Sequence, residues 1–298
     1  MERDYLEENL SVNRSMRRIA LNAPFYKRTT GIFKIIAYLD FLINVRQQRN
    51  RFYYRCFKQL GKFEKGLVLD VGCGGGNLIF KTLGKITGID IFIDNLLQAK
   101  NAYDHCAQAD LTNSLPFKDK RFNYVFSNDV IGHFLEKERD LILQEVHRVL
   151  KNNGYFISVI ETINLRSEEF RKSFPDWYPK KAEEAINIKG HIGMELPTEV
   201  LKRLKKAGFK VEYFKIIGFT PGYVQGYLTT IANKYPSTGN LEKIAKIISR
   251  VASKHWIIER ITDNIFGLIN SINMRRLDID YIGEGIMVLC KKENLNRN

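Results

Sequence analysis

The fold of this protein is decided by residues 67–77, Leu-Val-Leu-Asp-Val-Gly-Cys-Gly-Gly-Gly-Asn. The apolar residues of its first half predict a buried strand, and the glycines that follow let the backbone turn tightly and approach a ligand without an intervening Cβ. A glycine turn that leads into a helix presents free backbone N–H groups and the positive end of the helix dipole. We therefore predict a ligand-binding loop at the end of a strand.

The spacing of the glycines argues against a dinucleotide as the ligand. A dinucleotide fingerprint has glycines at its first, third and sixth positions, but the sixth position counted from Gly72 is Asn77. Asp70 stands just before the turn and would repel a pyrophosphate. An acid at that place suits a ligand that carries a cationic amine.

The pattern Asp70-x-Gly72-x-Gly74-x-Gly76 resembles motif I of the class I S-adenosylmethionine-dependent methyltransferases, of the small-molecule type similar to methyltransferase domain 11. The resemblance extends over roughly residues 63–215. It implies a Rossmann-like, seven-stranded, mostly parallel α/β sheet with helices on both faces, and S-adenosylmethionine as cofactor. It also implies that the three glycines line the methionine part of the cofactor and that Asp70 faces its amine.

A second acid follows at the end of the next predicted strand, 86–90. Asp90 lies 20 residues beyond Asp70, where an open α/β sheet places a carboxylate within reach of ribose hydroxyls. The competing interpretation of Asp90 as a helix cap is weaker, because Asp94 is the better cap for the predicted helix through Lys100. We predict that Asp90 and its neighbour Ile91 bind the cofactor.

A third acid, Asp110, follows a short predicted strand at 105–109. With Leu111 it resembles the methyltransferase segment in which an acid accepts a hydrogen bond from the adenine amino group and its apolar neighbour packs on the ring. From the sequence alone, Asp110 also suits a turn, but its position after the other two acids favours adenine recognition.

The fourth predicted strand, 122–126, is followed by Asn128, a further expected cofactor contact. Neither the Pro-Pro-aromatic tetrad of nucleic-acid amino-methyltransferases nor the Pro-Cys of cytosine C5 enzymes is present here. Gly132-His133-Phe134 resembles the small-molecule branch, so His133 is a candidate base, with helix capping or packing as the alternative. Glu161-Thr162 ends the fifth strand at the same edge, where contact with an acceptor is expected.

The irregular segment 164–196 is placed where an acceptor pocket is usually built. Trp177, Tyr178 and His191 are its candidate lining residues, with ordinary loop packing as the alternative. His133 and His191 are thus the two candidate catalytic residues, and no metal cluster is evident. The remaining predicted elements are helices at 78–83, 140–150 and 197–207 and strands at 155–160, 209–217 and 285–291.

Four segments are predicted: an N-terminal helical extension (1–62), the methyltransferase core (63–217), a helical insertion (218–284), and the last strand with the tail (285–298). The insertion contains basic amphipathic helices at 241–258 and 261–272, which suit a lid, a dimer surface or an interfacial membrane helix. In the extension, residues 32–60 interleave aromatics with arginines. That pattern predicts a packed helix face or, alternatively, stacking on nucleic-acid bases.

Composition places the chain among soluble globular proteins, with 298 residues, 44% apolar and 27% charged. The four cysteines lack C-x-x-C spacing, which argues against a zinc site or a disulfide framework and favours a reduced, cytoplasmic compartment. The first ten residues lack the apolar stretch of a signal peptide, and residues 31–45 are too short to span a bilayer.

The net charge of +14 is concentrated at two places. Residues 1–62 hold 13 Lys/Arg against 5 Asp/Glu, a net +8, and residues 240–276 hold 7 against 3, a net +4. These segments are either solvated helical faces or surfaces that dock on an anionic partner. The second interpretation predicts peripheral contact with an anionic membrane.

The sequence predicts an enzyme that moves a methyl group from S-adenosylmethionine to a small-molecule, lipid-linked or glycan acceptor. Two alternatives stay open at this stage. One is an RNA methyltransferase, suggested by the basic flanks although no RNA-binding module accompanies them. The other is a noncatalytic S-adenosylmethionine-binding regulator.

Overall fold

A computed structural model describes residues 31–43, 48–60, 65–165, 190–217, 264, 279–282 and 285–293. The elements in chain order are α2 (Gly31–Ile43), α3 (Gln48–Leu60), β1 (Gly66–Val71), η3 (Leu78–Thr82), β2 (Gly84–Asp90), α4 (Ile93–Ala99), β3 (His105–Gln108), β4 (Phe122–Asn128), η4 (Ile131–His133), α5 (Glu136–Val149), β5 (Leu150–Glu161), α8 (Pro197–Lys206), β6 (Phe209–Ile217), α12 (Ile279–Ile282) and β7 (Gly285–Lys292).

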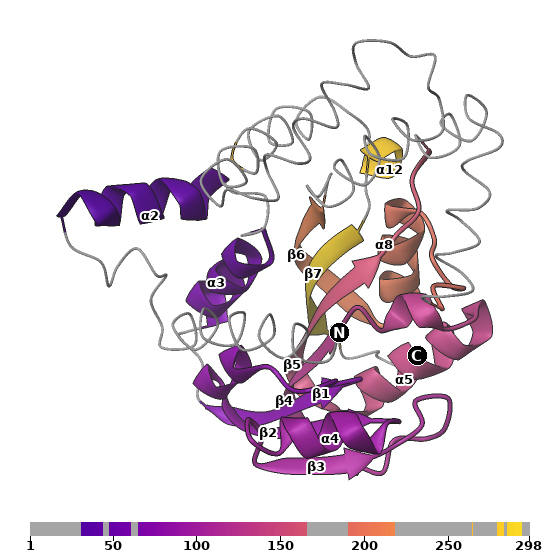
Figure 1. The fold of residues 1–298 in the computed structure, drawn as a ribbon. Helices are drawn as coiled ribbons and strands as arrows, with labels where there is room; N and C mark the ends of the chain where they lie inside the picture. The colour runs from indigo at the N-terminus through magenta and orange to yellow at the C-terminus, as the bar shows by residue number, and fades with distance from the viewer. Residues whose placement is uncertain are drawn as a thin grey trace, which may run out of the picture.

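The seven strands form one sheet in the order β3-β2-β1-β4-β5-β7-β6 (Figure 1). The first five strands of this order pair in parallel, and β7 lies antiparallel between β5 and β6. The predicted fold class is therefore confirmed, including the late antiparallel strand. Strand order reverses between β1 and β4, and in open α/β sheets ligands bind outside the carboxyl ends of the strands at such a point.

Alternate residues of the central strands pack on opposite faces of the sheet, because successive side chains of a strand point to opposite sides. Leu69 and Val125 belong to a core that includes residues of α5 and α8. Val68 and Phe126 belong to a second core that includes residues of α3, η3 and α4. Both faces are thus covered by helices, as the near-continuous apolar strands require.

Most predicted boundaries agree with the structure to within a few residues, and one expectation is wrong. The helix predicted after the glycine loop is present as a short 3-10 helix, η3. The cap of α4 is not Asp94, which lies within its first turn; the Asp90 carboxylate instead accepts from the backbone N–H of Phe92 at 2.9 Å. Asp90 therefore bonds the backbone beside the place where the cofactor is predicted to bind.

The two described helices of the N-terminal extension differ in their surroundings. In α3 the aromatic residues Phe52 and Tyr53 are buried in the second core, which confirms the prediction of a packed face for that helix. In α2 the apolar residues Ile32, Ile35 and Leu39 are half or more exposed. Figure 1 shows α2 projecting from the body of the protein on its α3 side.

The predicted helices at 241–258 and 261–272 lie outside the described residues. The end of the insertion is described as α12, where the Asp280 carboxylate accepts from the Thr198 backbone N–H at 2.9 Å and from its hydroxyl. No helix within the described ranges is long and apolar enough to cross a membrane. All four cysteines are free thiols, so the expectation of no disulfide is confirmed.

Candidate functional site

The glycine loop leaves β1 at the carboxyl edge of the sheet and has the conformation that its sequence predicts. Gly72 and Gly74 have φ of +67° and +50°, in the left-handed region where a Cβ is strained. A Cβ on Gly72 would lie 2.5 Å from Val130, so this glycine permits close packing of the loop on the β4 edge. A Cβ on Gly74 would meet no atom of the described residues within 4 Å, so within that part of the chain the loop at Gly74 borders open space that a ligand can fill.

Asp70 is buried at the end of β1, with 3% of its surface exposed. Its carboxylate accepts from the Tyr103 hydroxyl, which in turn accepts from the backbone N–H of Asn77 at 2.6 Å. Burial raises the pKa of Asp70 to about 7, although the Tyr103 hydrogen bond opposes that shift and Asp90 adds to it. No basic side chain bonds this carboxylate within the described part of the chain, so a cationic ligand would stabilise its charged form.

Asp90 holds the loop from the side of β2. One carboxylate oxygen accepts from the Gly74 backbone N–H at 2.8 Å. The other accepts from Phe92 N–H at 2.9 Å and from the Asn95 side-chain amide at 3.1 Å. A carboxylate has about four lone-pair sites, so it can still accept from a ligand hydroxyl. Asp90, which the sequence predicts to bind the ribose, therefore also holds the glycine loop in its conformation.

The other predicted cofactor residues differ in exposure. Asp110 is exposed and accepts from the backbone N–H and hydroxyl of Thr112, at 2.9 and 2.8 Å, which lowers its carboxyl pKa. Leu111 is buried in the first core, whereas the side chain of Ile91 is half exposed. Asp110 is thus also the turn residue that the alternative interpretation describes, and Ile91 offers apolar surface beside Asp90.

Helix α3 closes the site over the end of β4. The Tyr53 hydroxyl donates to the side-chain oxygen of Asn128, and the Arg49 guanidinium bonds both carboxylate oxygens of Asp129. Asp129 has a φ of +55°, which directs the chain from β4 towards η4. Sequence reasoning missed Arg49 and Tyr53, because nothing local in an aromatic and basic helix indicates a partner more than 70 residues away.

Three ionisable side chains converge beyond β4: His133 of η4, Glu161 at the end of β5, and His191. The His191 Nε2 lies 3.5 Å from Glu161 Oε1, and the two imidazole rings have centroids 4.6 Å apart at 67°. The His133 Nδ1 lies 3.1 Å from the Gly190 carbonyl oxygen, which can only accept, so that nitrogen carries the proton. The structure therefore brings together the two histidines that the sequence suggested and Glu161, which the sequence placed at the same edge.

Of these three side chains, Glu161 has the most unusual environment. Its Oε2 is buried with no hydrogen-bond partner among the residues that the structure describes. Burial raises the pKa of its carboxyl to about 7, with a further increase from Asp129 and a smaller opposing effect of Arg49. A buried carboxylate oxygen without a donor is costly unless a ligand supplies one.

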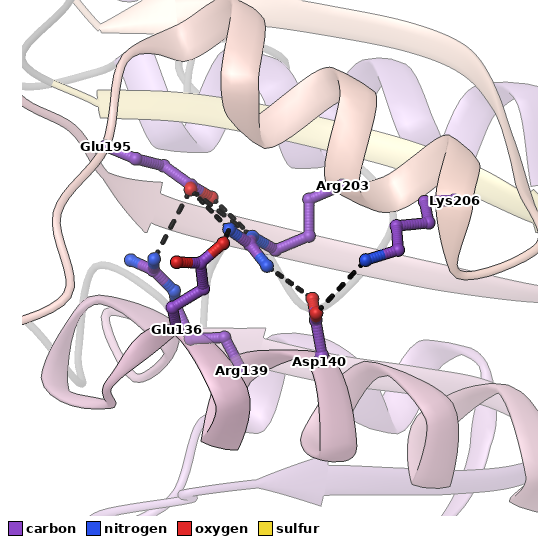
Figure 2. A network of polar contacts seen from close by, with 6 residues as sticks. All are labelled: Glu136, Arg139, Asp140, Glu195, Arg203 and Lys206. Carbon is purple, nitrogen blue, oxygen red and sulfur yellow. Dashed lines mark hydrogen bonds and ion pairs between the residues drawn. The ribbon is translucent and has the colours of Figure 1, made fainter.

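The segment that carries His191 is held by a polar network that joins it to α5 and α8 (Figure 2). Arg203 donates to both oxygens of Glu195 at 2.9 Å, and it also bonds Asp140. Arg139 lies 3.3 Å from Glu195, and Lys206 lies 3.4 Å from Asp140. Glu195 also pairs through its backbone with Thr162 and Ile163, which follow Glu161 directly; residue Glu136 completes the network.

A backbone contact fixes the same segment against η4. Gly193 N–H donates to the Gly132 carbonyl at 2.9 Å, and a Cβ on Gly193 would lie 1.8 Å from the Phe134 carbonyl oxygen. Only glycine permits this approach. The two other pocket candidates, Trp177 and Tyr178, lie outside the described residues.

A family model described as a methyltransferase domain matches residues 69–158. An uncharacterised protein of Methanocaldococcus jannaschii is 31% identical over 160 residues, which cover 49% of this chain and 62% of that protein. The chain thus spans less than two thirds of this relative.

One solved structure shares the fold, and another is less similar. A Galdieria sulphuraria protein, provisionally described as a sarcosine dimethylglycine methyltransferase, has a TM-score of 0.50 at 14% identity, over 83% of this chain and 85% of that one. A Haemonchus contortus phosphoethanolamine N-methyltransferase, solved with S-adenosylmethionine, has a TM-score of 0.48 at 17% identity, over 82% of this chain and 53% of that one.

Proposed function

We propose, because residues 69–158 match a methyltransferase domain and carry the glycine and acid pattern that resembles the class I S-adenosylmethionine-dependent methyltransferases, that this protein transfers a methyl group from S-adenosylmethionine to a small-molecule, lipid-linked or glycan acceptor. The observation that carries the proposal is the open space at Gly74 between the acids that end β1 and β2. This space lies at the switch point of the sheet, where the strand order reverses between β1 and β4. Glu161 ends β5 on the same side, and His133 and His191 converge on it from η4 and from the segment before α8.

The residues around the loop suit the chemical groups of S-adenosylmethionine. Asp70 is a buried acid without a basic partner in the described chain, and a cationic amine would neutralise it. Asp90 retains accepting capacity for a ribose hydroxyl, while Ile91 and Asp110 offer an apolar and an accepting surface for the adenine. Asn128 lies on the same edge, beside the loop. S-adenosylmethionine supplies an already activated methyl group, so the protein mainly has to position the acceptor.

The acceptor side contributes the groups that hold and move a proton. His133 is oriented by the Gly190 carbonyl, and His191 is placed against Glu161. An acceptor oxygen or nitrogen that lies between these rings and the cofactor would find an imidazole nitrogen that can take its proton. We assign the base to this pair of histidines, with Glu161 orienting His191.

The first test is a calorimetric titration of the protein with S-adenosylmethionine and, in parallel, with NAD. We expect micromolar binding of S-adenosylmethionine alone, because Asp70 stands where a pyrophosphate would be repelled. Binding of NAD, or of neither compound, would contradict the assignment of the glycine loop.

Turnover distinguishes the enzyme from its two alternatives. We expect formation of S-adenosylhomocysteine when lipid and small-molecule extracts are added to the protein. Methyl transfer to RNA, together with RNA binding that weakens steeply as the salt concentration rises, would show that the acceptor is RNA and not a small-molecule, lipid-linked or glycan acceptor. Tight cofactor binding without turnover on any extract would favour a regulator.

For the acceptor we favour a lipid-linked molecule that is met at an anionic membrane surface. The basic extension and the exposed apolar residues of α2 support this choice, since the two together suit the boundary between lipid headgroups and acyl chains. We expect the full chain to sediment with vesicles that contain anionic lipid. Glutamate substitutions at Ile35 and Leu39 should reduce that sedimentation, whereas equal sedimentation would contradict the membrane proposal.

A further inference from the structure

We propose that His133, Glu161 and His191 form a binding site for a divalent transition-metal ion, which the sequence did not indicate. The three side chains come from η4, from the end of β5 and from the segment before α8, so no local spacing connects them. One potential ligand atom from each lies within 4.8 Å of the others. The three potential ligands therefore come together only in the folded protein.

The distances suit a metal ion better than a simple ion pair. A tetrahedral ion with bonds of about 2.1 Å holds its ligand atoms about 3.4 Å apart. The 3.5 Å between His191 Nε2 and Glu161 Oε1 has that spacing, and modest rotations bring in the third ligand. An ion pair would involve only two of the three residues, and it would leave the buried Glu161 Oε2 without a partner in the described chain.

The surroundings orient these side chains as ligands of metal sites are usually oriented. Metal-binding histidines generally donate their second ring N–H to a carbonyl or carboxylate. His133 does so through Nδ1 to the Gly190 carbonyl, which leaves the lone pair on Nε2 for a metal. The ion pairs of Glu195 in Figure 2 and the Gly193–Gly132 hydrogen bond hold the His191 segment in place.

The donor set indicates which ions fit. Two imidazoles and one carboxylate suit Zn²⁺, Co²⁺, Fe²⁺ or Mn²⁺, whereas Mg²⁺ and Ca²⁺ prefer oxygen ligands. Three protein ligands leave a coordination position open, as in catalytic zinc sites. That position would hold an acceptor oxygen and make its proton easier to lose to water. With the ion bound, the imidazole lone pairs would be engaged as ligands, so the metal would act in place of the histidine base. This role rests on the proposed function, but the metal site itself does not.

The test is a titration of the full-length, tag-free protein with Co²⁺, followed by absorption spectroscopy in the visible range. We expect one ion per chain at micromolar affinity. Glu161→Gln and His191→Asn should each raise the dissociation constant at least about tenfold, since each removes a ligand. His105→Asn is the matched control, because His105 is an exposed histidine on β3, away from the cluster, and the affinity should stay the same.

A second measurement keeps the proposal testable where a variant is destabilised. Zn²⁺ should raise the thermal midpoint of the wild-type protein and of His105→Asn, but not that of Glu161→Gln, which preserves the size of the side chain. Absence of Co²⁺ binding, or equal affinity in Glu161→Gln, would overturn the metal site. Calorimetry with S-adenosylmethionine on metal-free protein tests the proposed function separately.

Discussion

The two halves of the ligand edge are built in different ways. Around β1 and β2, the acids already have partners: Asp70 accepts from Tyr103, and Asp90 accepts from Gly74, Phe92 and Asn95. Around β4 and β5, Glu161 keeps a buried oxygen without a partner in the described chain and faces two histidines. The first half, where we propose that the cofactor binds, is already held in place by hydrogen bonds. The second half is a cluster that the proposed ligand would complete.

We therefore distinguish the β1–β2 half, which would position the cofactor, from the β4–β5 half, which would hold the reacting groups. The glycine loop is held by the hydrogen bond from the Gly74 N–H to Asp90, so the half proposed to bind the cofactor is organised before a ligand arrives. The acceptor half is organised from outside, by the network of Arg203 and Glu195 that holds the His191 segment. Substitutions in each half should therefore affect different measurements.

The largest expected effect is that of Asp90→Ala on cofactor binding. The change removes an acceptor for the ribose and frees the Gly74 N–H, so we expect the affinity for S-adenosylmethionine to fall at least about 100-fold. Calorimetry measures it. Asp94→Ala in the same segment should leave the affinity within about twofold, because Asp94 does not cap α4. If Asp90→Ala binds S-adenosylmethionine with wild-type affinity, the assignment of the cofactor to the β1–β2 half is wrong.

The second effect is the loss of stability in Arg203→Met. Arg203 is 12% exposed and bonds Glu195 at 2.9 Å, so its removal leaves a largely buried carboxylate with Arg139 alone. We expect the free energy of unfolding to fall by about 2 kcal/mol. Lys206→Met is the control; its side chain is 78% exposed, and the loss should stay under about 0.5 kcal/mol. Denaturant titrations measure both, and equal losses would contradict the supporting role of the network.

The same division explains how far the sequence could be interpreted. The strands, the glycine loop and the acids at 70 and 90 have local signatures, since each depends on residues close in the chain. The pairing of His133 with His191 crosses 58 residues, and the Arg49–Asp129 contact crosses 80. Such contacts depend on the packed fold, so the sequence could name the two histidines and Glu161 but not that their side chains meet.

Within the cofactor half, the buried acid predicts a pH dependence of binding. Burial raises the pKa of Asp70 to about 7, so the carboxylate loses its charge as the pH falls from 8 to 6. If the charged form binds the cofactor amine, the dissociation constant should rise by up to about tenfold for each pH unit below 7. Asp70→Asn should bind weakly and show a flat profile. An unchanged dependence in that variant would place the titrating group elsewhere.

The raised pKa also has a consequence for the protein without ligand. A folded state with a higher carboxyl pKa than the unfolded state binds protons more tightly, so its stability falls as the pH rises from about 4 towards 7. Asp70→Asn should remove this contribution. Thermal melts at several pH values, with the wild type beside the variant, measure the difference.

The smallest effect is expected where α3 joins the end of β4. Arg49 and Asp129 form a bidentate pair, but their side chains are 48% and 33% exposed, so solvent weakens the attraction. We expect Arg49→Met to cost about 0.5 to 1 kcal/mol of unfolding free energy. Lys202→Met, which breaks a pair on α8 that is 73% and 49% exposed, should cost less. A loss above about 2 kcal/mol of unfolding free energy in Arg49→Met would mean that α3 supports the acceptor half as strongly as the Arg203 network does. An exposed ion pair alone contributes less than that, so the larger loss would require that the contact also organises its neighbours.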